Sequence, residues 1–167
     1  LYFQRHDGQA VTCDDFAQAI ADANPDSELS RQLDAFKRWY SQSGTPRVTA
    51  RGEYNASERS YTLSLSQSCP ATPGQSEKQA FVIPVAVGLI DAQGHDLPLR
   101  LRGEAQASGC TRLLVLSEAS ERFVFEDIDT EPVPSILRGF SAPVTVDNGL
   151  SDTQLKHLLA HDGDAFN

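Results

Sequence analysis

The chain has 167 residues, of which 40% are hydrophobic and 22% charged, and its formal net charge at pH 7 is −9. This length and composition are typical of one soluble globular domain with short attachments, and they exclude an intrinsically disordered chain. No apolar run approaches the ~18 residues that a membrane-spanning helix needs. The acidic balance, without any basic cluster, argues against nucleic acid as a partner.

The beginning of the chain and its cysteines bear on its origin. There is no signal-peptide pattern and no Met, so we expect Leu1 not to be a native translation start. Residues 1–4 fit either native sequence or the remnant of an engineered protease site. Cys13, Cys69 and Cys110 form neither a disulfide framework nor a C-x-x-C metal spacing. We therefore expect reduced thiols and a cytoplasmic protein.

Two helices are predicted before residue 41. Thr12 and Asp15 have the spacing of a capping box, which predicts a helix over residues 13–22 that ends at Asn24. A second helix is predicted from Ser27, because apolar residues recur at the spacing of one helical face. These residues are Leu29, Leu33, Phe36 and Tyr40. We expect this apolar face to pack against the β-region that follows.

The run from Arg38 to Pro46 separates the helical part from this β-region. It holds the only Trp of the chain, Trp39. Gly44 is placed to end the helix in a left-handed turn, and Pro46 prevents the helix from continuing. A lone aromatic beside an amphipathic helix is usually part of a core, so we expect Trp39 to be buried at the junction.

After residue 46 the apolar period changes to two, which is typical of strands with one buried face. Seven or eight short strands indicate a β-sandwich, with a hairpin turn at residues 91–94. The strands are predicted near residues 48–54, 61–65, 81–90, 97–101, 113–116, 123–125, 134–140 and 144–146. The predicted core includes Tyr61, Leu63, Leu65, Ile83, Val85, Leu113, Val115, Phe123 and Phe125.

The strand over residues 81–90 is apolar on both faces. Pro84 cannot donate to a ladder, which predicts a position at a sheet edge or a bulge. An apolar outer face needs a cover, and we expect either the preceding helices or another domain to supply it.

A final helix is predicted after Gly149. Ser151 or Asp152 can cap it, and Leu155, Leu158 and Leu159 form an apolar stripe. The run from Glu126 to Glu131 does not have the spacing of an EF-hand, so a solvated loop is expected there. Asp162 to Asp164 is interpreted as a turn.

Three segments carry a resemblance to a known family: residues 6–16 (HDGQAVTCDDF), 38–46 (RWYSQSGTP) and 136–144 (ILRGFSAPV). With them, nearly the whole chain resembles bacterial aminopeptidase N, a family of zinc metallopeptidases. The resemblance implies the end of a catalytic, thermolysin-like domain at 1–23, a leading helix and sandwich domain at 24–148, and the start of a C-terminal helical domain at 149–167. The predicted fold class is therefore mainly β, an immunoglobulin-like antiparallel β-sandwich with flanking N-terminal and C-terminal helices.

The family needs H-E-x-x-H on a helix, and this chain lacks that motif. His157 and His161 share its spacing, but Leu158 stands where the Glu belongs, and we interpret the pair as ordinary helix histidines. The resemblance implies that the zinc ligands and catalytic residues lie upstream. We therefore assign no catalytic, cofactor-binding or metal residue to this chain and expect no cofactor in it, although the parent would hold zinc.

The resemblance implies a non-catalytic scaffold within an enzyme that hydrolyses N-terminal residues from peptides. Its partners would be the catalytic and C-terminal helical domains of the same polypeptide, with peptide substrate reached only through the parent. Two alternatives stay open. One is an independent immunoglobulin-like binding module without enzymatic activity, and the other is a small metalloenzyme built on His157 and His161.

Overall fold

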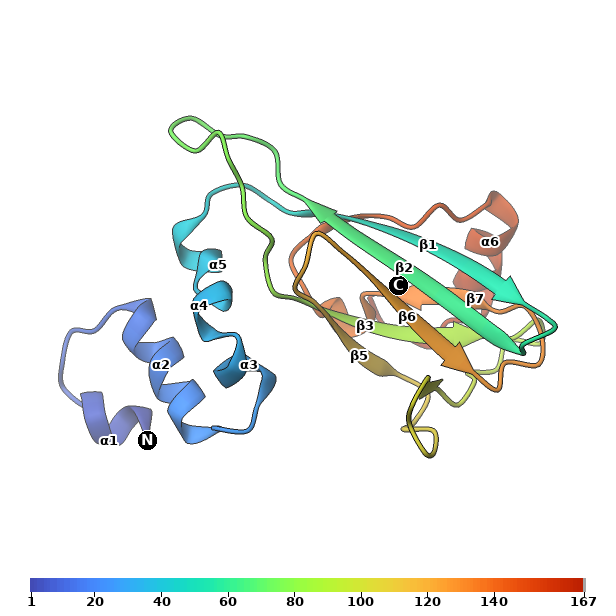
Figure 1. Cartoon of the computed structure of the whole chain (residues 1–167), viewed down its shortest axis with the longest axis horizontal. Helices are drawn as coiled ribbons and strands as arrows, with labels where there is room; N and C mark the ends of the chain where they lie inside the picture. The colour runs from blue at the N-terminus through green and yellow to red at the C-terminus, as the bar shows by residue number, and fades with distance from the viewer. Residues whose placement is uncertain (167) are drawn as a thin grey trace.

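The structure is a computed structural model that describes residues 1–166. Figure 1 shows a group of short helices beside a two-layered β-structure. The helices are α1 (Tyr2–His6), α2 (Cys13–Ala23), α3 (Glu28–Arg31), α4 (Leu33–Phe36), α5 (Arg38–Ser41), the 3-10 helix η1 (Arg138–Phe140) and α6 (Asp152–His161). The strands are β1 (Arg47–Asn55), β2 (Ser60–Ser68), β3 (Ile83–Ile90), β4 (Arg100–Leu101), β5 (Arg112–Leu116), β6 (Ser120–Glu126), β7 (Val133–Ile136) and β8 (Thr145–Asp147). Within the described part, no helix is both long and apolar enough to span a membrane.

The strands form two sheets, one of five strands in the order β4-β6-β2-β1-β8 and one of three in the order β5-β3-β7. β1 and β2 pair antiparallel along their full length, from Arg47 opposite Ser68 to Asn55 opposite Ser60. The one departure from the predicted antiparallel arrangement is β8, which runs parallel to β1. The predicted mainly β sandwich with flanking helices is confirmed.

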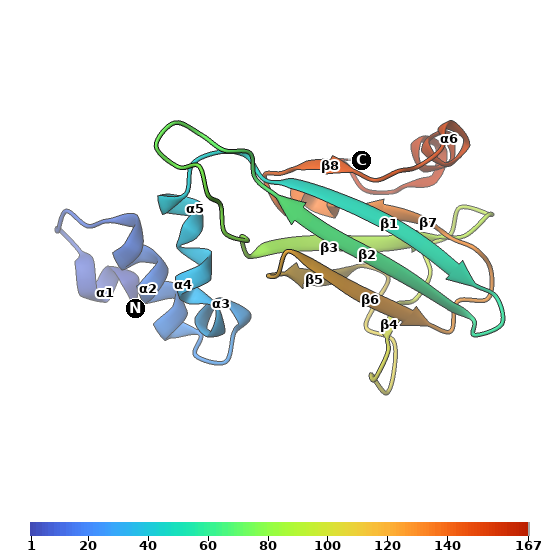
Figure 2. The same ribbon diagram turned by 45° about the horizontal axis from the view of Figure 1, so that its top comes forward.

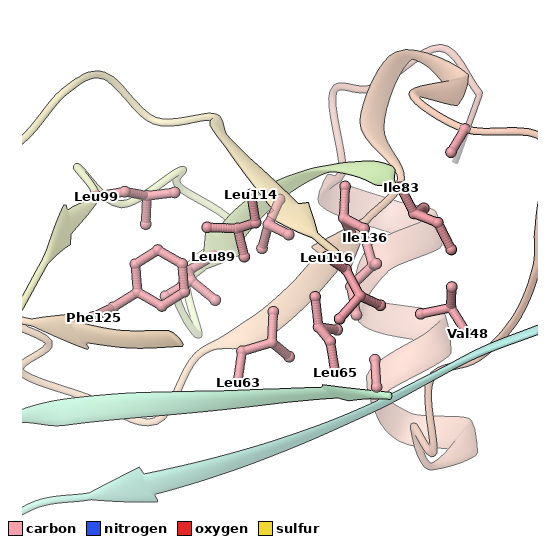
Figure 3. Close-up of a cluster of buried hydrophobic side chains, with 14 of the residues drawn as sticks. Val48, Leu63, Leu65, Ile83, Leu89, Leu99, Leu114, Leu116, Phe125 and Ile136 are labelled. Atoms are coloured by element: carbon pink, nitrogen blue, oxygen red, sulfur yellow. The ribbon is translucent and has the colours of Figure 1, made fainter. Parts of the chain in front are cut away.

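The core lies between the two sheets. Figure 3 shows side chains of β2 pointing toward side chains of β3, β5 and β7 in the other layer. Six of the predicted core residues are buried: Tyr61, Leu63, Leu65, Ile83, Val85 and Phe125. Phe123 is partly buried and packs against the same cluster. Alternation therefore identified the inward faces of β2 and β6 correctly.

The prediction for β5 was wrong by one residue. Leu114 and Leu116 are buried, whereas Leu113 is 59% exposed and Val115 is only partly buried. The run Leu-Leu-Val-Leu is apolar in both phases, so alternation cannot choose between them. The pairing register with β3 decides which residues are buried, because Leu114 lies opposite the inward-facing Val85 and Leu116 lies opposite Ile83.

The position predicted for β3 was also wrong, because β3 is the central strand of its sheet. Pro84 is tolerated because β7 pairs only with residues 87–90 of β3. The amide of Ala86 points to the β7 side, where it donates to Ser141 Oγ at 2.9 Å. Backbone N–H groups two residues apart on a strand point to the same side. The N–H that Pro84 lacks would therefore point to the β7 side, where no strand pairs with residue 84.

Two other predicted strands are shorter than expected. The segment over residues 97–101 forms only the two-residue β4, although Leu99 is fully buried. The segment over residues 134–140 leaves β7 after Ile136 and continues into η1. The predicted turn at residues 91–94 is present, with Gly94 N–H donating to Asp91 O at 3.1 Å.

The first predicted helix is confirmed, since α2 begins with the complete Thr12–Asp15 capping box and ends at Asn24. The second is three short helices, α3 to α5, in place of one. Ser30 Oγ donates to the carbonyl oxygens of Ala21 and Asn24, each at 2.7 Å, which ties α3 to the end of α2. At Gln32 the backbone leaves helical geometry, and α3 ends there.

The apolar face of this segment does not cover the sandwich. Figures 1 and 2 show α1 to α4 beyond one end of the two sheets, and both α3 and α4 contact α2. Leu29, Leu33 and Phe36 are only partly buried, and Tyr40 is 50% exposed. The prediction that this face packs on the β-region was therefore wrong, and the contact is made by Trp39.

The last predicted helix is confirmed as α6, which is capped by Ser151. It contacts β7. Two residues of its apolar stripe are exposed, Leu155 at 44% and Leu159 at 84%. The cover expected on the outer face of β3 comes in part from Arg138, whose guanidinium lies against Gly88.

Candidate functional site

The helical part joins the sandwich through Trp39. Its indole N–H donates to Val82 O at 2.8 Å. Its ring lies against Phe81, with the ring centroids 4.7 Å apart. Phe81 is buried in the sandwich core, and Trp39 packs against that core. The prediction that Trp39 lies at the junction is confirmed, although the side chain is partly rather than fully buried.

Two neighbours of Trp39 extend this contact along the segment before β3. Arg38 donates to Ala80 O at 2.5 Å. The side-chain amide of Gln42 makes two bonds with the backbone of Gln79: its Nε2 donates to the carbonyl at 2.9 Å, and its Oε1 accepts from the amide at 2.8 Å. Backbone polar groups outside a ladder need partners, and here α5 and its cap residue supply them.

Gln67 of β2 holds the same segment from the sandwich side. Its Oε1 accepts from Phe81 N, and its Nε2 donates to Phe81 O, both at 2.8 Å. Residues 79–82 are therefore held between the end of the helical part and the sandwich. We call the contacts of Arg38, Trp39 and Gln42 with residues 79–82 the Trp39 junction.

The link after α5 is fixed by the loop that precedes residues 79–82. Lys78 Nζ donates to Ser43 O at 2.8 Å and to Thr72 Oγ1 at 2.7 Å. Gly44 has the predicted left-handed backbone, with φ +102°, but it lies two residues beyond the cap residue Gln42. A Cβ on Gly44 would lie 2.9 Å from Cys69 Sγ, so the close approach of this sulfur also favours glycine.

His157 and His161 are placed beside the turn at residues 91–94. His157 Nε2 lies 2.8 Å from Asp91 O, the geometry of a donated hydrogen bond, and the two imidazole rings are 4.6 Å apart. Among residues 1–166, no group of three or more His, Cys, Asp or Glu side chains is arranged to hold a metal ion.

Three carboxylates of the acidic run at residues 126–131 form ion pairs with arginines. Glu126 pairs with Arg102 and Arg100, and Asp127 pairs with Arg100 at 2.7 Å. Asp129 pairs with Arg59 at 2.6 Å. The hydrogen bond from Arg100 holds the pKa of Asp127 below its ordinary value, and the bond from Arg102 does the same for Glu126. The expected solvated loop is only partly correct, because Glu126 is the last residue of β6.

Sequence reasoning missed Arg138. This residue is only 7% exposed, and it pairs with Asp96 and with Asp162, two residues far apart in the sequence. Asp162 therefore belongs to a buried ion-pair cluster rather than to the plain surface turn that was predicted. The available signal was a single cation inside the apolar run from Ile136 to Phe140.

The fold and the junction define a class of protein domain: an immunoglobulin-like β-sandwich with a helical segment fastened to one end. The chain belongs to the family described as "Domain of unknown function (DUF3458) Ig-like fold", which matches residues 44–149. The resemblance to aminopeptidase N is also confirmed, because residues 44–149 match an Ig-like domain and nearly the whole chain is similar to proteins with that name.

Three curated relatives carry the name Aminopeptidase N. The chain is 47% identical to the protein of Escherichia coli over 161 residues, which is 96% of this chain. It is 39% identical to that of Haemophilus influenzae over 95% of the chain, and 38% identical to that of Caulobacter vibrioides over 100%. The matched regions span 18%, 17% and 18% of these relatives' own lengths.

A solved structure has a similar fold. It is the crystal structure of Legionella pneumophila aminopeptidase A in complex with aspartic acid, and the TM-score is 0.77 at 29% sequence identity. The match covers 98% of this chain and 16% of that one.

Proposed function

We propose that this chain is a non-catalytic scaffold domain of a zinc-dependent aminopeptidase, an enzyme that hydrolyses N-terminal residues from peptides. The observation that carries the proposal is the similarity along nearly the whole chain to proteins named Aminopeptidase N, of which it spans under a fifth. In this proposal the zinc ligands and the catalytic groups belong to other parts of the polypeptide, and this chain supplies none of them.

The proposed domain borders are those that the resemblance implies. Residues 1–23 close the catalytic domain, residues 24–148 form the leading helices and the sandwich, and residues 149–167 begin the C-terminal helical domain. The Trp39 junction supports a scaffold role, because its hydrogen bonds and ring contact hold the helical part against the sandwich at one defined place. The partners are then the catalytic and C-terminal helical domains, and peptide reaches the protein only through the former.

We also propose that the protein is cytoplasmic. All three cysteines are unpaired in the structure, and reduced thiols are usual in that compartment.

The experiment compares the 167-residue chain with the full-length protein, using hydrolysis of an aminoacyl-anilide. The full-length protein is expected to hydrolyse the substrate and to lose this activity when a chelator removes its metal. The chain alone is expected to show none and to retain no stoichiometric zinc after dialysis. Hydrolysis that scales with the concentration of the chain and stops with chelator would refute the scaffold assignment, and an inactive full-length protein would refute the peptidase.

A further inference from the structure

Arg138 lies at the centre of a buried ion-pair cluster on the outer face of the three-stranded sheet. Its guanidinium lies so close to Gly88 of β3 that a Cβ there would be 2.0 Å from Arg138 Cζ. A buried guanidinium requires charged or polar partners. Four of them belong to the sandwich: Arg138 donates to Ser135 Oγ at 2.9 Å, to Thr111 Oγ1 at 3.0 Å, to Cys110 O at 3.5 Å and to Asp96 Oδ1 at 2.5 Å.

The fifth partner comes from the segment that follows α6. Arg138 Nη2 donates to Asp162 Oδ1 at 3.3 Å, and the side chain of Asp162 is only 1% exposed. Two residues later, Asp164 makes a second contact with this region, since Gly139 N–H donates to Asp164 Oδ2 at 2.8 Å. Two carboxylates of one short acidic turn therefore bind two adjacent residues of η1.

The backbone that presents these donors is unusual. Leu137 and Phe140 have positive φ angles of +63° and +52°. This backbone conformation is unfavourable in free energy for any residue that carries a side chain. Such a conformation persists only where the surroundings hold it. Here the contacts of Arg138 hold the segment after Leu137. Ser141 holds the segment after Phe140, because its Oγ accepts from Ala86 N in β3.

Apart from the acidic turn, α6 contacts β7, and its last residue, His161, lies against Gly94. Its exposed leucine Leu159 buries little apolar surface. Its polar contact with the turn after β3 is the bond between His157 and Asp91. A helix of ten residues is marginal in water without tertiary contacts, and the acidic turn supplies α6 with its buried, charged contact to the sandwich.

We infer that Arg138 and Gly139 form a docking site for the acidic turn Asp162–Asp164, and that this contact holds α6 on the sandwich. Arg138 supplies a buried cation and Gly139 an exposed backbone N–H, and their partners are two carboxylates on a tight turn. When the contact is lost, α6 separates and frays while the sandwich stays folded. The site fixes the direction in which the chain leaves the sandwich, independently of any peptidase activity.

The test is hydrogen exchange by mass spectrometry on the full-length protein, comparing peptides from α6 with peptides from β2. Asp162→Ala and Arg138→Met are each expected to speed exchange in α6 at least 10-fold and to change β2 less than 2-fold. The double variant is expected to be no faster than the faster single variant, because both changes remove the same contact. Lys156→Gln, an exposed change on the same helix, is the matched control and is expected to leave α6 unchanged.

Unaltered exchange in α6 in the Asp162→Ala variant would overturn the inference. An equal rise in β2 would also overturn it, because the cluster would then be part of the global stability of the sandwich. If Arg138→Met does not fold, Asp164→Ala decides in its place, since it removes the bond to Gly139 and a local bond to Phe166 N but leaves the pair of Arg138 with Asp162 in place. That variant is expected to speed exchange in α6 at least 3-fold, and no change there would count against the docking site.

Discussion

Replacing Trp39 by Ala tests the junction most directly. A Trp side chain buries roughly 150 to 250 Å², and the lower figure applies because Trp39 is only partly buried. At about 25 cal/mol per Å², this corresponds to about 4 kcal/mol as an upper bound. Ala retains part of that area, while the lost hydrogen bond to Val82 adds about 1 kcal/mol. We expect Trp39→Ala to lower the free energy of unfolding by about 3 to 4 kcal/mol.

The measurement is equilibrium unfolding in urea followed by far-ultraviolet circular dichroism, since the variant lacks the only Trp. Trp39→Phe keeps a ring against Phe81 but lacks the N–H, and it is expected to lose about 1 to 2 kcal/mol. The control is Tyr40→Ala, because Tyr40 is the next residue and is half exposed. A Trp39→Ala variant within about 0.5 kcal/mol of wild type would show that the junction does not hold the helical part.

Three further changes test other parts of the structure. Gln42→Ala removes both bonds to Gln79, and we expect a loss of about 1 to 2 kcal/mol in the same unfolding assay. Gly88→Ala places a methyl group where the Arg138 guanidinium lies, and we expect it to lower the thermal midpoint by more than 5 °C; calorimetry showing an unchanged midpoint would contradict this packing. Burial raises the pKa of the Tyr61 hydroxyl, and its coulombic interaction with a nearby carboxylate adds to the rise. Because the folded state favours the protonated phenol, its stabilisation is complete below the unfolded pKa of about 10 and is lost as pH rises above it. As the pH is raised from 9 to 11, the Tyr61→Phe variant is therefore expected to lose less free energy of unfolding than the wild type, as measured by urea titrations. Equal losses in the two proteins would show that folding does not raise the pKa of the Tyr61 hydroxyl.

Local patterns predicted the parts of this fold that local chemistry decides. The capping box at Thr12 needs only residues three apart, and α2 begins there as predicted. Strict alternation of apolar and polar residues identified the buried face of β2, because only one phase of that strand is apolar. The sequence also led to the family through two segments before the sandwich and one within it, and the comparisons agree with it.

Patterns failed where two arrangements satisfied the same local rule. Leu113 and Leu114 are equally apolar, and only pairing with β3 buries the second. Pro84 predicted an edge strand or a bulge, yet β3 is central, and Pro84 is tolerated there because β7 is too short to reach its position. The apolar face of the second helical segment was expected to pack on the sandwich, yet its residues stay partly exposed, and α3 and α4 contact α2.

The sequence by itself determined the element types, most of the inward face of the sandwich and the importance of the run around Trp39. Those features depend on residues close together in the chain, where period, capping and turn chemistry act directly. Only the tertiary structure decided how the strands pair within the two sheets and which residues gather around Arg138. Asp96 and Asp162 lie 42 and 24 residues from Arg138 in the chain, so no local pattern relates the three, and the buried guanidinium brings them together because its charge must be neutralised there.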